Sequence, residues 1–342
     1  MLWPMAYDNR TTTDEVLEGV DLTGRRIVIT GAASGLGFES ARALASHGAH
    51  VTVLARSEER VAPAVDALRL LVPDGSFEPG VVDLADLASI GAFADGYLAD
   101  HPAVDVLINN AGVIQAGPAE HMQLADFEDA MATHMWGPLY LMRAAAEHMR
   151  AQGHGRVVNI ASIGGKVAVP HLLPYSTSKF ALVGLSDGMR SELAKHNITV
   201  TTVCPGLMRT GSHFNALFKG QHRKEFSWFS VIDALPISSI DAQRAAHQIL
   251  EACRRGDAQL VITPQAKLLA LASALLPELT ASGLRLMNRL LPGPADSGAG
   301  DFSRTGRESQ SPVAPSVLTR LADRAAVLNN GLNGSSETLA LD

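Results

Sequence analysis

Tyr175 and Lys179 stand four residues apart in the stretch PYSTSKF, residues 174–180. In a helix, side chains at positions i and i+4 lie one above the other on the same face, so the phenol and the amine are expected to be neighbours. A nearby ammonium group favours the phenolate and lowers the pKa of the tyrosine toward the range of proton exchange at neutral pH. The pair is therefore a candidate general acid and base, although a YxxxK pattern alone also fits a solvated turn of helix.

Alternating strands and helices must position this pair. The expected strands are RIVIT at 26–30, HVTVLA at 50–55, FEPGVV at 77–82, VDVLIN at 104–109, GRVVNIA at 155–161 and ITVTTV at 198–203. Helical patterns separate them, including one long stretch from about 124 to 150. Near-continuous apolar strands separated by helices are typical of a parallel sheet covered on both faces. The sequence therefore predicts a doubly wound α/β fold.

The residues that follow each strand are the candidates for ligand binding, because such sheets bind ligands at the carboxyl ends of their strands. TGAASGLG, residues 30–37, follows the first strand and precedes a helix. Gly31, Gly35 and Gly37 allow a sharp turn and a close approach to a pyrophosphate at the helix N-terminus. The GxxxGxG spacing differs from the GxGxxG pattern, yet the strand–turn–helix context favours a nucleotide site over a simple tight turn.

The second strand is followed by Arg56 where an acidic residue would hold a ribose 2′-hydroxyl. An arginine can pair with a 2′-phosphate, so the sequence favours NADP(H) over NAD(H), unless Arg56 pairs with Glu58 or Glu59 at the surface. Asp83, after the third strand, is placed to contact adenine. The small, polar sequence NNAG, residues 109–112, follows the fourth strand, where the backbone must pass close to the cofactor.

Ser162 lies at the carboxyl end of the fifth strand, thirteen residues before Tyr175. Its hydroxyl is therefore expected at the same edge of the sheet as the phenol. Ser162 can hold a substrate oxygen, Tyr175 can pass it a proton, and Lys179 can lower the tyrosine pKa while holding the nicotinamide ribose.

These motifs, TGAASGLG, NNAG, Ser162, YSTSK and PGLMRT, occur in the order typical of the short-chain dehydrogenase/reductase family, which the chain resembles over about Leu22 to Thr263. The resemblance implies a Rossmann-type domain with a seven-stranded sheet, hydride transfer without a metal, and dimers or tetramers built on two long helices. It implies that the backbone near Pro205 and Gly206 meets the nicotinamide carboxamide and that Thr210 assists. The cofactor contacts implied are Gly31, Ser34, Gly35, Leu36, Gly37, Arg56, Asp83, Leu84, Asn110, Ala111, Gly112, Tyr175, Lys179, Pro205, Gly206 and Thr210.

One position departs from the family pattern. The family usually places an Asn in the helix after NNAG, where it supports a water-linked proton relay to the lysine, and THMWG places His134 there. An imidazole both donates and accepts, so His134 is a candidate catalytic residue whose pKa near 6.5 would add a pH dependence. A purely structural helix residue is the alternative.

Composition excludes several other classes. The net charge of -7 argues against nucleic acid as an electrostatic partner. The two cysteines form no CxxC pair and the twelve histidines no ligand cluster, so we expect no metal site. No secretory signal or membrane span is read from the sequence, and a cytoplasmic protein is expected, with peripheral contact with the membrane as an option.

The expected function is an NADP(H)-dependent oxidoreductase that interconverts a carbonyl and an alcohol. A non-catalytic NADP(H)-binding sensor or scaffold on the same fold is the alternative, favoured only by the altered Asn position. The segment after PG supplies the aromatic residues Phe214, Phe218, Phe226, Trp228 and Phe229. They indicate a bulky apolar substrate, or else belong to the core or to subunit contacts.

The expected domain organisation is a lead segment at 1–21, the catalytic domain at 22–264, a helical extension at 265–292 and a largely disordered tail at 293–342. The extension is apolar before Pro277 and basic and amphipathic after it. We expect two helices joined near Pro277 that lie by the substrate mouth and contact a membrane peripherally through residues 266–294. Contact with a partner subunit or packing on its own domain are the alternatives.

Overall fold

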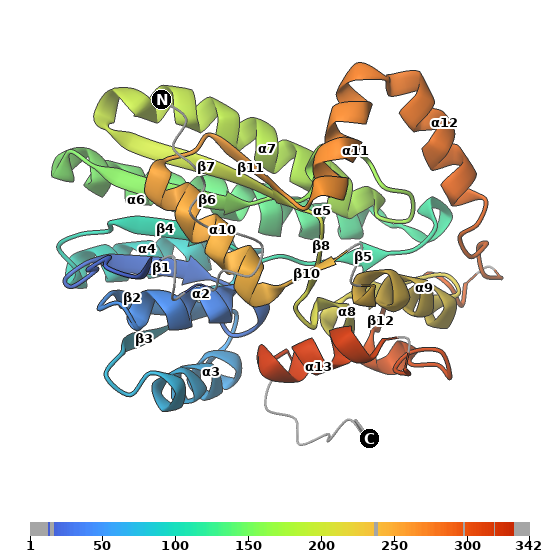
Figure 1. Cartoon of the computed structure of the whole chain (residues 1–342), viewed down its shortest axis with the longest axis horizontal. Coiled ribbons are helices and arrows are strands. Elements are labelled where there is room, and N and C mark those ends of the chain that lie inside the picture. Colours follow the sequence, from blue (N-terminus) through green and yellow to red (C-terminus); the bar gives the residue numbers. More distant parts are fainter. Residues whose placement is uncertain (1–12, 14–16, 236–238, 297, 318, 332–342) are drawn as a thin grey trace.

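Seven parallel strands form the central sheet, in the spatial order β11-β7-β6-β4-β1-β2-β3 (Figure 1). The computed structural model describes residues 13, 17–235, 239–296, 298–317 and 319–331. The strands are β1 (Arg26–Thr30), β2 (His50–Ala55), β3 (Ser76–Val81), β4 (Val106–Asn109), β6 (Gly155–Ile160), β7 (Ile198–Pro205) and β11 (Gln259–Ile262). The order reverses direction at β1, which is adjacent to both β2 and β4. The predicted doubly wound fold is confirmed.

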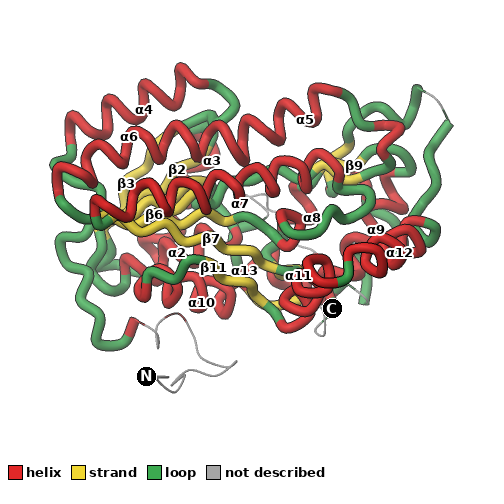
Figure 2. Tube along the Cα trace, turned by 90° about the horizontal axis from the view of Figure 1, so that it is seen from above, coloured by secondary structure: helices red, strands yellow, loops and turns green. Residues whose placement is uncertain are grey.

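Helices cover both faces of this sheet. Side chains alternate between the faces along each strand, and because the strands carry apolar side chains on both faces, both faces must be buried. In β1, Ile27 and Ile29 belong to one buried cluster with α2, α3 and α10, whereas Val28 belongs to another with α4 and α6. Figure 2 shows α4, α5, α6 and α7 on one side of the strands and α2 and α10 on the other. The helices are α2 (Gly35–Ala45), α3 (Glu58–Leu71), α4 (Leu87–Asp100), α5 (Leu124–Met131), α6 (Gly137–Gln152), α7 (Leu173–Leu193) and α10 (Ala242–Arg255).

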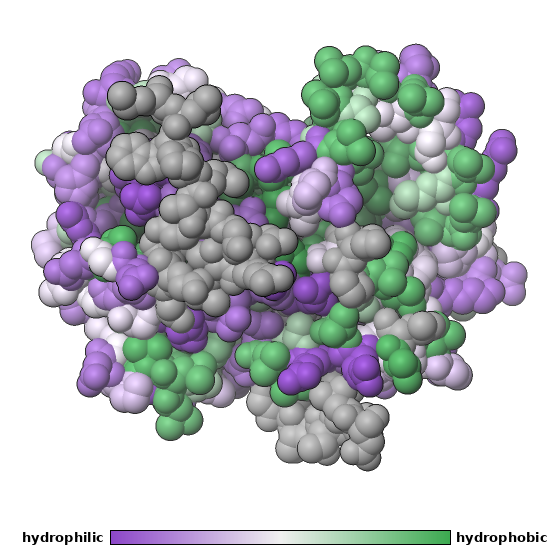
Figure 3. Space-filling view, viewed as in Figure 1, coloured by the Kyte–Doolittle hydropathy of each residue, from purple (hydrophilic) through white to green (hydrophobic). Residues whose placement is uncertain are grey.

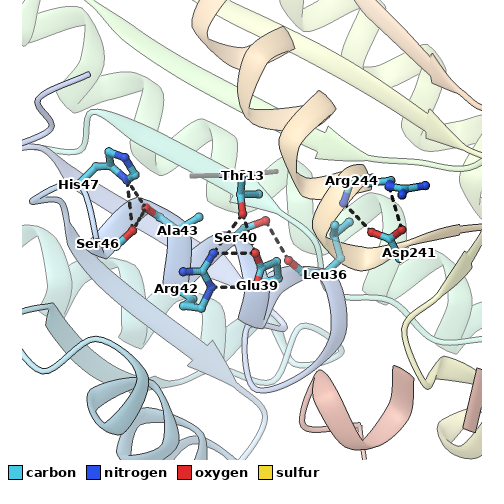
Figure 4. A network of polar contacts seen from close by, with 10 residues as sticks. All are labelled: Thr13, Leu36, Glu39, Ser40, Arg42, Ala43, Ser46, His47, Asp241 and Arg244. Carbon is cyan, nitrogen blue, oxygen red and sulfur yellow. Dashed lines mark hydrogen bonds and ion pairs between the residues drawn. The ribbon is translucent and has the colours of Figure 1, made fainter. Parts of the chain in front are cut away.

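The N-terminal part of the chain contacts this layer through Thr13. Its hydroxyl donates to Glu39 over 2.7 Å, and Arg42 donates to both Thr13 and Glu39 (Figure 4). In the same view Asp241 accepts a hydrogen bond from the backbone N–H of Arg244 and so caps α10. These contacts fix the outer surfaces of α2 and α10, which lie against each other.

The aromatic residues after β7 form a separate core. Phe214, Phe218, Phe226 and Phe229 are buried against one another, and Ala314 and Ala326 from the C-terminal part of the chain complete the cluster. The surrounding elements are β5 (Gln115–Ala116), η1 (Ala119–His121), β8 (Leu207–Arg209), α8 (Ser212–Asn215), β9 (Leu217–Phe218), α9 (His222–Ala234) and β10 (Ser239–Asp241). Of the two interpretations left open by the sequence, core packing therefore accounts for these phenylalanines.

Two helices follow the last strand and project from the domain. They are α11 (Pro264–Leu275) and α12 (Pro277–Asn288), so the predicted helix pair joined near Pro277 is confirmed. Only Ala266 is buried in α11, and no residue of α12 is. Apolar side chains crowd the exposed surface of this hairpin (Figure 3), and its exposed leucines are Leu268, Leu271, Leu275, Leu276, Leu279, Leu286 and Leu290.

The C-terminal part of the chain contains packed elements where the sequence predicted a largely disordered tail. They are β12 (Arg304–Thr305), η5 (Arg307–Ser309) and α13 (Arg320–Leu328). β12 pairs with β9, and α13 buries Ala322 and Ala326 completely. The expectation of disorder is therefore wrong for this stretch, because small apolar residues spaced along the tail complete the aromatic cluster. Residues 332–342 lie outside the described part of the chain.

Candidate active site

The glycine-rich loop joins β1 to α2 and bends through two glycines with positive φ, Gly31 at 64° and Gly35 at 61°. Gly37 is required for a different reason. A Cβ atom there would lie 2.5 Å from Nδ2 of Asn110 and 2.7 Å from the carbonyl oxygen of Gly31. The loop can therefore form only if these positions lack side chains, as the sequence predicted.

Thr30 and Asn110 tie this loop to the end of β4. The Thr30 hydroxyl accepts hydrogen bonds from the backbone N–H of Asn110 and of Ala111, over 2.9 and 3.0 Å. The side-chain amide of Asn110 donates to the carbonyl oxygens of Thr30 and Gly31, both over 3.0 Å. The Ser34 side chain makes no capping hydrogen bond, so it satisfies none of the first N–H groups of α2. This cradle of glycines before a helix N-terminus fits the pyrophosphate of a dinucleotide.

Basic side chains gather where β2 ends. Arg56 follows the strand and Arg60 lies one turn into α3; both are exposed. Burial of its stem lowers the pKa of Arg60, and the positive charges of Arg56 and Arg307 lower it further. Among the described residues, no ion pair joins Arg56 to Glu58 or Glu59, the alternative that the sequence left open. Clustered positive charge at this strand end fits a phosphate group.

Asp83 and Leu84 follow β3, as expected. The Asp83 carboxylate accepts a hydrogen bond from the backbone N–H of Ala85 over 3.0 Å, which fixes a tight turn. Leu84 is buried and faces Gly137, where a Cβ would approach it within 3.1 Å. Both residues therefore lie at the edge of the sheet that carries the glycine-rich loop.

Ser162, Tyr175 and Lys179 converge where β6 and α7 meet. Ser162 is the N-cap of the short 3-10 helix η3 (Ile163–Gly165), and its hydroxyl accepts from the backbone N–H of Gly164 over 3.0 Å. Gly164 lies between the two hydroxyl-bearing residues, since a Cβ there would be 3.4 Å from Ser162 Oγ and 3.1 Å from the Tyr175 ring. The Ser162 hydroxyl also lies near enough to the phenol of Tyr175 to lower its pKa. The expected grouping therefore exists in the structure.

The electrostatics of the Tyr175 and Lys179 pair differ from the sequence expectation. Burial raises the pKa of Tyr175, and the Ser162 hydroxyl opposes this only in part. Lys179 is 3% exposed, its Nζ donates to the carbonyl oxygen of Ile160 over 2.8 Å, and burial lowers its pKa to about 7. The ammonium lies 5.7 Å from the centre of the Tyr175 ring. The predicted lowering of the tyrosine pKa is therefore wrong for this arrangement, because desolvation is the largest influence on the phenol and Lys179, whose own pKa falls to about 7, does not offset it.

His134 occupies η2 (Ala132–Trp136), a π-helical turn between α5 and α6, and is fully buried. Its Nε2 accepts from the backbone N–H of Val113 over 3.0 Å, and its Nδ1 lies 2.7 Å from Oγ of Ser178. Burial and the positive charge of Lys179 hold the pKa of His134 well below its ordinary value. Both ring nitrogens therefore make hydrogen bonds within the protein. The imidazole is neutral near pH 6.5, so the expected pH dependence at that value is wrong for this environment.

The residues after β7 reach the same edge of the sheet. Pro205 ends the strand, and the Gly206 N–H donates to the carbonyl oxygen of Ile262 over 3.3 Å. Thr210 is buried against Gly35, where a Cβ would lie 3.4 Å from Cβ of Thr210. Thr210 therefore lies beside the glycine-rich loop. Sequence reasoning did not single out Ser178, although its position one residue before Lys179 was a usable signal.

Comparisons with known proteins identify the family of the chain. The family model described as short chain dehydrogenase matches residues 25–217, and the chain belongs to this family of oxidoreductases, which use a nicotinamide cofactor. A Dehydrogenase/reductase SDR family protein 7-like from Anopheles gambiae is 34% identical over 249 residues, which are 71% of this chain and 76% of that protein.

Solved structures show the same fold. A short-chain dehydrogenase from Streptomyces avermitilis is 30% identical, with a TM-score of 0.64 over 78% of this chain and 98% of that one. A metagenomic short-chain oxidoreductase in complex with NADP is 38% identical, with a TM-score of 0.52 over 54% of this chain and 83% of the other. The present chain therefore carries segments beyond the length that the Streptomyces protein covers.

Proposed function

We propose that this protein is an NADP(H)-dependent oxidoreductase that interconverts a small-molecule carbonyl and the corresponding alcohol at Ser162, Tyr175 and Lys179. The observation that carries the proposal is the convergence of these three side chains beside the loop formed by Gly31, Gly35 and their neighbours. A nicotinamide bound at the end of β7 would supply or accept the hydride.

Each side chain has a role that follows from its surroundings. Ser162 presents a hydroxyl that can hold the substrate oxygen. Tyr175 keeps its proton at neutral pH, because burial raises its pKa, and can donate that proton to the substrate oxygen during reduction. Lys179 uses one Nζ–H for Ile160, which leaves the other N–H groups for ribose hydroxyls.

We also propose that NADP(H) is preferred over NAD(H). Arg56 and Arg60 place two exposed guanidinium groups after β2, where a 2′-phosphate would lie, and bidentate hydrogen bonds suit that partner. The metagenomic relative bound to NADP supports the same choice by analogy.

His134 is proposed as a positioning residue. It links the loop after β4, through Val113, to the catalytic helix α7, through Ser178. Ser178 in turn donates to the carbonyl oxygen of Tyr175 over 2.9 Å. The ring of His134 also lies edge-on to that of Tyr175, with 5.5 Å between the ring centres. The imidazole thereby fixes the start of α7 relative to the loop.

Single-turnover oxidation of NADPH with a panel of carbonyl compounds tests the proposed activity. Tyr175→Phe should reduce hydride transfer by at least about 100-fold while NADPH binding stays within about twofold, because the ring remains and only the proton is lost. Tyr140→Phe, on α6, is the matched control and should behave as wild type. A Tyr175→Phe variant that transfers hydride at the wild-type rate would refute the assignment.

The hairpin of α11 and α12 is proposed as a peripheral contact with an anionic membrane surface. Its exposed leucines cannot be accounted for by packing within the described chain, and Lys267, Arg285 and Arg289 are exposed beside them, against Glu278 as the acidic residue of the two helices. Apolar residues with a basic border are typical of interfacial helices. No helix in the described part of the chain is long and apolar enough to cross a bilayer.

A further inference from the structure

The end of the described chain lies on the glycine-rich loop. We call residues 320–331, which comprise α13 and the three residues after it, the C-terminal strap. In Figure 1 α13 lies along the lower edge of the molecule, below α8, β8 and β10. It contacts both α9 and β8, the strand that leads to Thr210.

Three hydrogen bonds hold the last residues of the strap. The backbone N–H of Gly35, the first residue of α2, donates to the carbonyl oxygen of Asn329 over 2.7 Å. The side-chain amide of Asn330 donates to the carbonyl oxygen of Ala33 over 2.8 Å. The amide of Asn215 donates to the carbonyl oxygen of Gly331 over 3.1 Å. Two of the three bonds therefore join the strap to the glycine-rich loop itself.

Close packing anchors α13 beneath these contacts. Ala326 is fully buried against Gly211, where a Cβ atom would lie 2.6 Å from both Cα and Cβ of Ala326. Asp323 is 2% exposed, accepts a hydrogen bond from the Thr319 hydroxyl over 2.6 Å, and lies 3.3 Å from Nε2 of the buried His213. The strap therefore packs closely against the domain and makes buried polar contacts with it.

The strap and a dinucleotide need the same groups. The N–H groups at the start of α2 form the seat of a pyrophosphate in this type of fold, since they carry the positive end of the helix dipole. The carbonyl oxygen of Asn329 accepts from the first of them, and a carbonyl oxygen is the same kind of acceptor as a phosphate oxygen. A phosphate group at the N–H of Gly35 therefore requires that Asn329 move away.

We propose that the C-terminal strap is an autoinhibitory segment that competes with the nicotinamide nucleotide for the N-terminus of α2. The proposal rests on the proposed function, because it presumes that the loop binds such a nucleotide. When the strap leaves, it exposes the N–H of Gly35 and the carbonyl oxygen of Ala33 together. A nucleotide that binds only the open form has an apparent affinity reduced by the fraction of molecules that are open.

Direct titration of NADPH tests this competition. Deletion of residues 320–342 should lower the Kd for NADPH by about 10-fold, within the usual range of coupling between sites. Ala326→Leu overfills the contact with Gly211 and should act in the same direction. Asn330→Gly removes the bond to Ala33, keeps the positive φ of 54° accessible, and should give a smaller decrease. Val327→Leu, at a half-exposed site of the same helix, is the control and should leave the Kd unchanged.

Hydrogen exchange of the full-length protein gives a readout that is independent of activity. Saturating NADPH should increase exchange in peptides that cover residues 320–331, because the nucleotide displaces the strap. Unchanged or decreased exchange, or equal Kd values for the full-length and strap variants, would overturn the competition and leave the proposed function intact. If neither the full-length protein nor the variants bind any nicotinamide nucleotide, the proposed function fails and the competition fails with it.

Discussion

Nδ1 of His134 lies 2.7 Å from Oγ of Ser178, and the second contact of the ring, with Val113, determines the direction of this hydrogen bond. Nε2 accepts from the N–H of Val113, so the ring proton must reside on Nδ1 and be donated to Ser178. The Ser178 hydroxyl donates a hydrogen bond to the carbonyl oxygen of Tyr175. A neutral histidine therefore connects the backbone after β4 to the backbone of the catalytic helix without a charged group.

Replacement of His134 should affect the geometry of the site and leave its titration unchanged. His134→Ala should lower kcat by about 10- to 100-fold, because small displacements of a catalytic group are costly, and should lower Tm by leaving the buried N–H of Val113 without an acceptor. The acid limb of the pH–rate profile should stay where it is. His134→Asn, whose amide both donates and accepts, should recover most of the rate. A shifted acid limb in either variant would show that the imidazole titrates during turnover.

Removal of Arg56 should discriminate between the two cofactors. Arg56→Ala should weaken NADPH binding by roughly 1.5–3 kcal/mol, the usual contribution of hydrogen bonds to charged groups, and leave NADH binding nearly unchanged. Arg143→Ala, an exposed arginine on α6, is the control for the general loss of a positive charge. Isothermal titration with each cofactor measures the difference. Equal losses for NADPH and NADH would contradict the proposed 2′-phosphate contact.

Asp233 should destabilise the folded protein above pH 6. Burial raises its pKa from 3.8 to about 6, against the opposing charges of His213 and Arg209. Between these two values the folded state holds a proton that the unfolded state has lost, so the contribution of Asp233 to stability falls as pH rises through the window. The full cost, roughly 2–3 kcal/mol at 1.36 kcal/mol per unit, persists at higher pH.

Asp233→Asn should therefore raise the free energy of unfolding at pH 8 and raise it about half as much at pH 5. Chemical denaturation at the two pH values measures both gains, and Asp95→Asn, at an exposed site on α4, is the control. A variant that is less stable than wild type at pH 8 would mean that the carboxylate is held by attraction to His213, which lies 3.8 Å away.

The helical hairpin should bind anionic liposomes through its exposed leucines. Leu275→Glu combined with Leu279→Glu, both 67% exposed, should abolish co-sedimentation with vesicles that contain phosphatidylserine while leaving the elution volume in size-exclusion chromatography unchanged. Leu70→Glu, 83% exposed on α3, is the control for the added charge. If wild type does not co-sediment and the double variant elutes later, the hairpin is a contact between copies of this chain.

Much of the fold and the site could be predicted because local signals agree with their surroundings. The strand before Gly31, the helix that begins at Gly35, and the four-residue spacing of Tyr175 and Lys179 on one helix are all present in the folded chain. Arrangements that depend on distant packing could not be predicted. The fall in the pKa of Lys179 comes from desolvation, and the sequence carries no direct record of how deeply a side chain is buried.

The C-terminal region shows the same limit. Its content of Gly, Ser and Pro resembles that of disordered segments, and the composition does not reveal that Ala326 fits against Gly211. The role of the phenylalanines after β7 could not be predicted either. A sequence does not distinguish an aromatic ring that faces a ligand from one that faces the protein interior. Only the position of Phe214 and Phe226 in one buried cluster separates these cases.

The hydrogen bond between Asn330 and Ala33 joins residues 297 positions apart in the sequence. Ribosomes add about 5–20 residues per second, so on the order of 15–60 s separates the synthesis of the glycine-rich loop from that of the strap. Throughout this interval the nascent chain has the loop and lacks its competitor. The cradle also needs Asn110 from the end of β4, so it is complete only after that strand has joined the sheet. The strap is synthesised later still, and under the proposed competition a nucleotide can reach the completed cradle first.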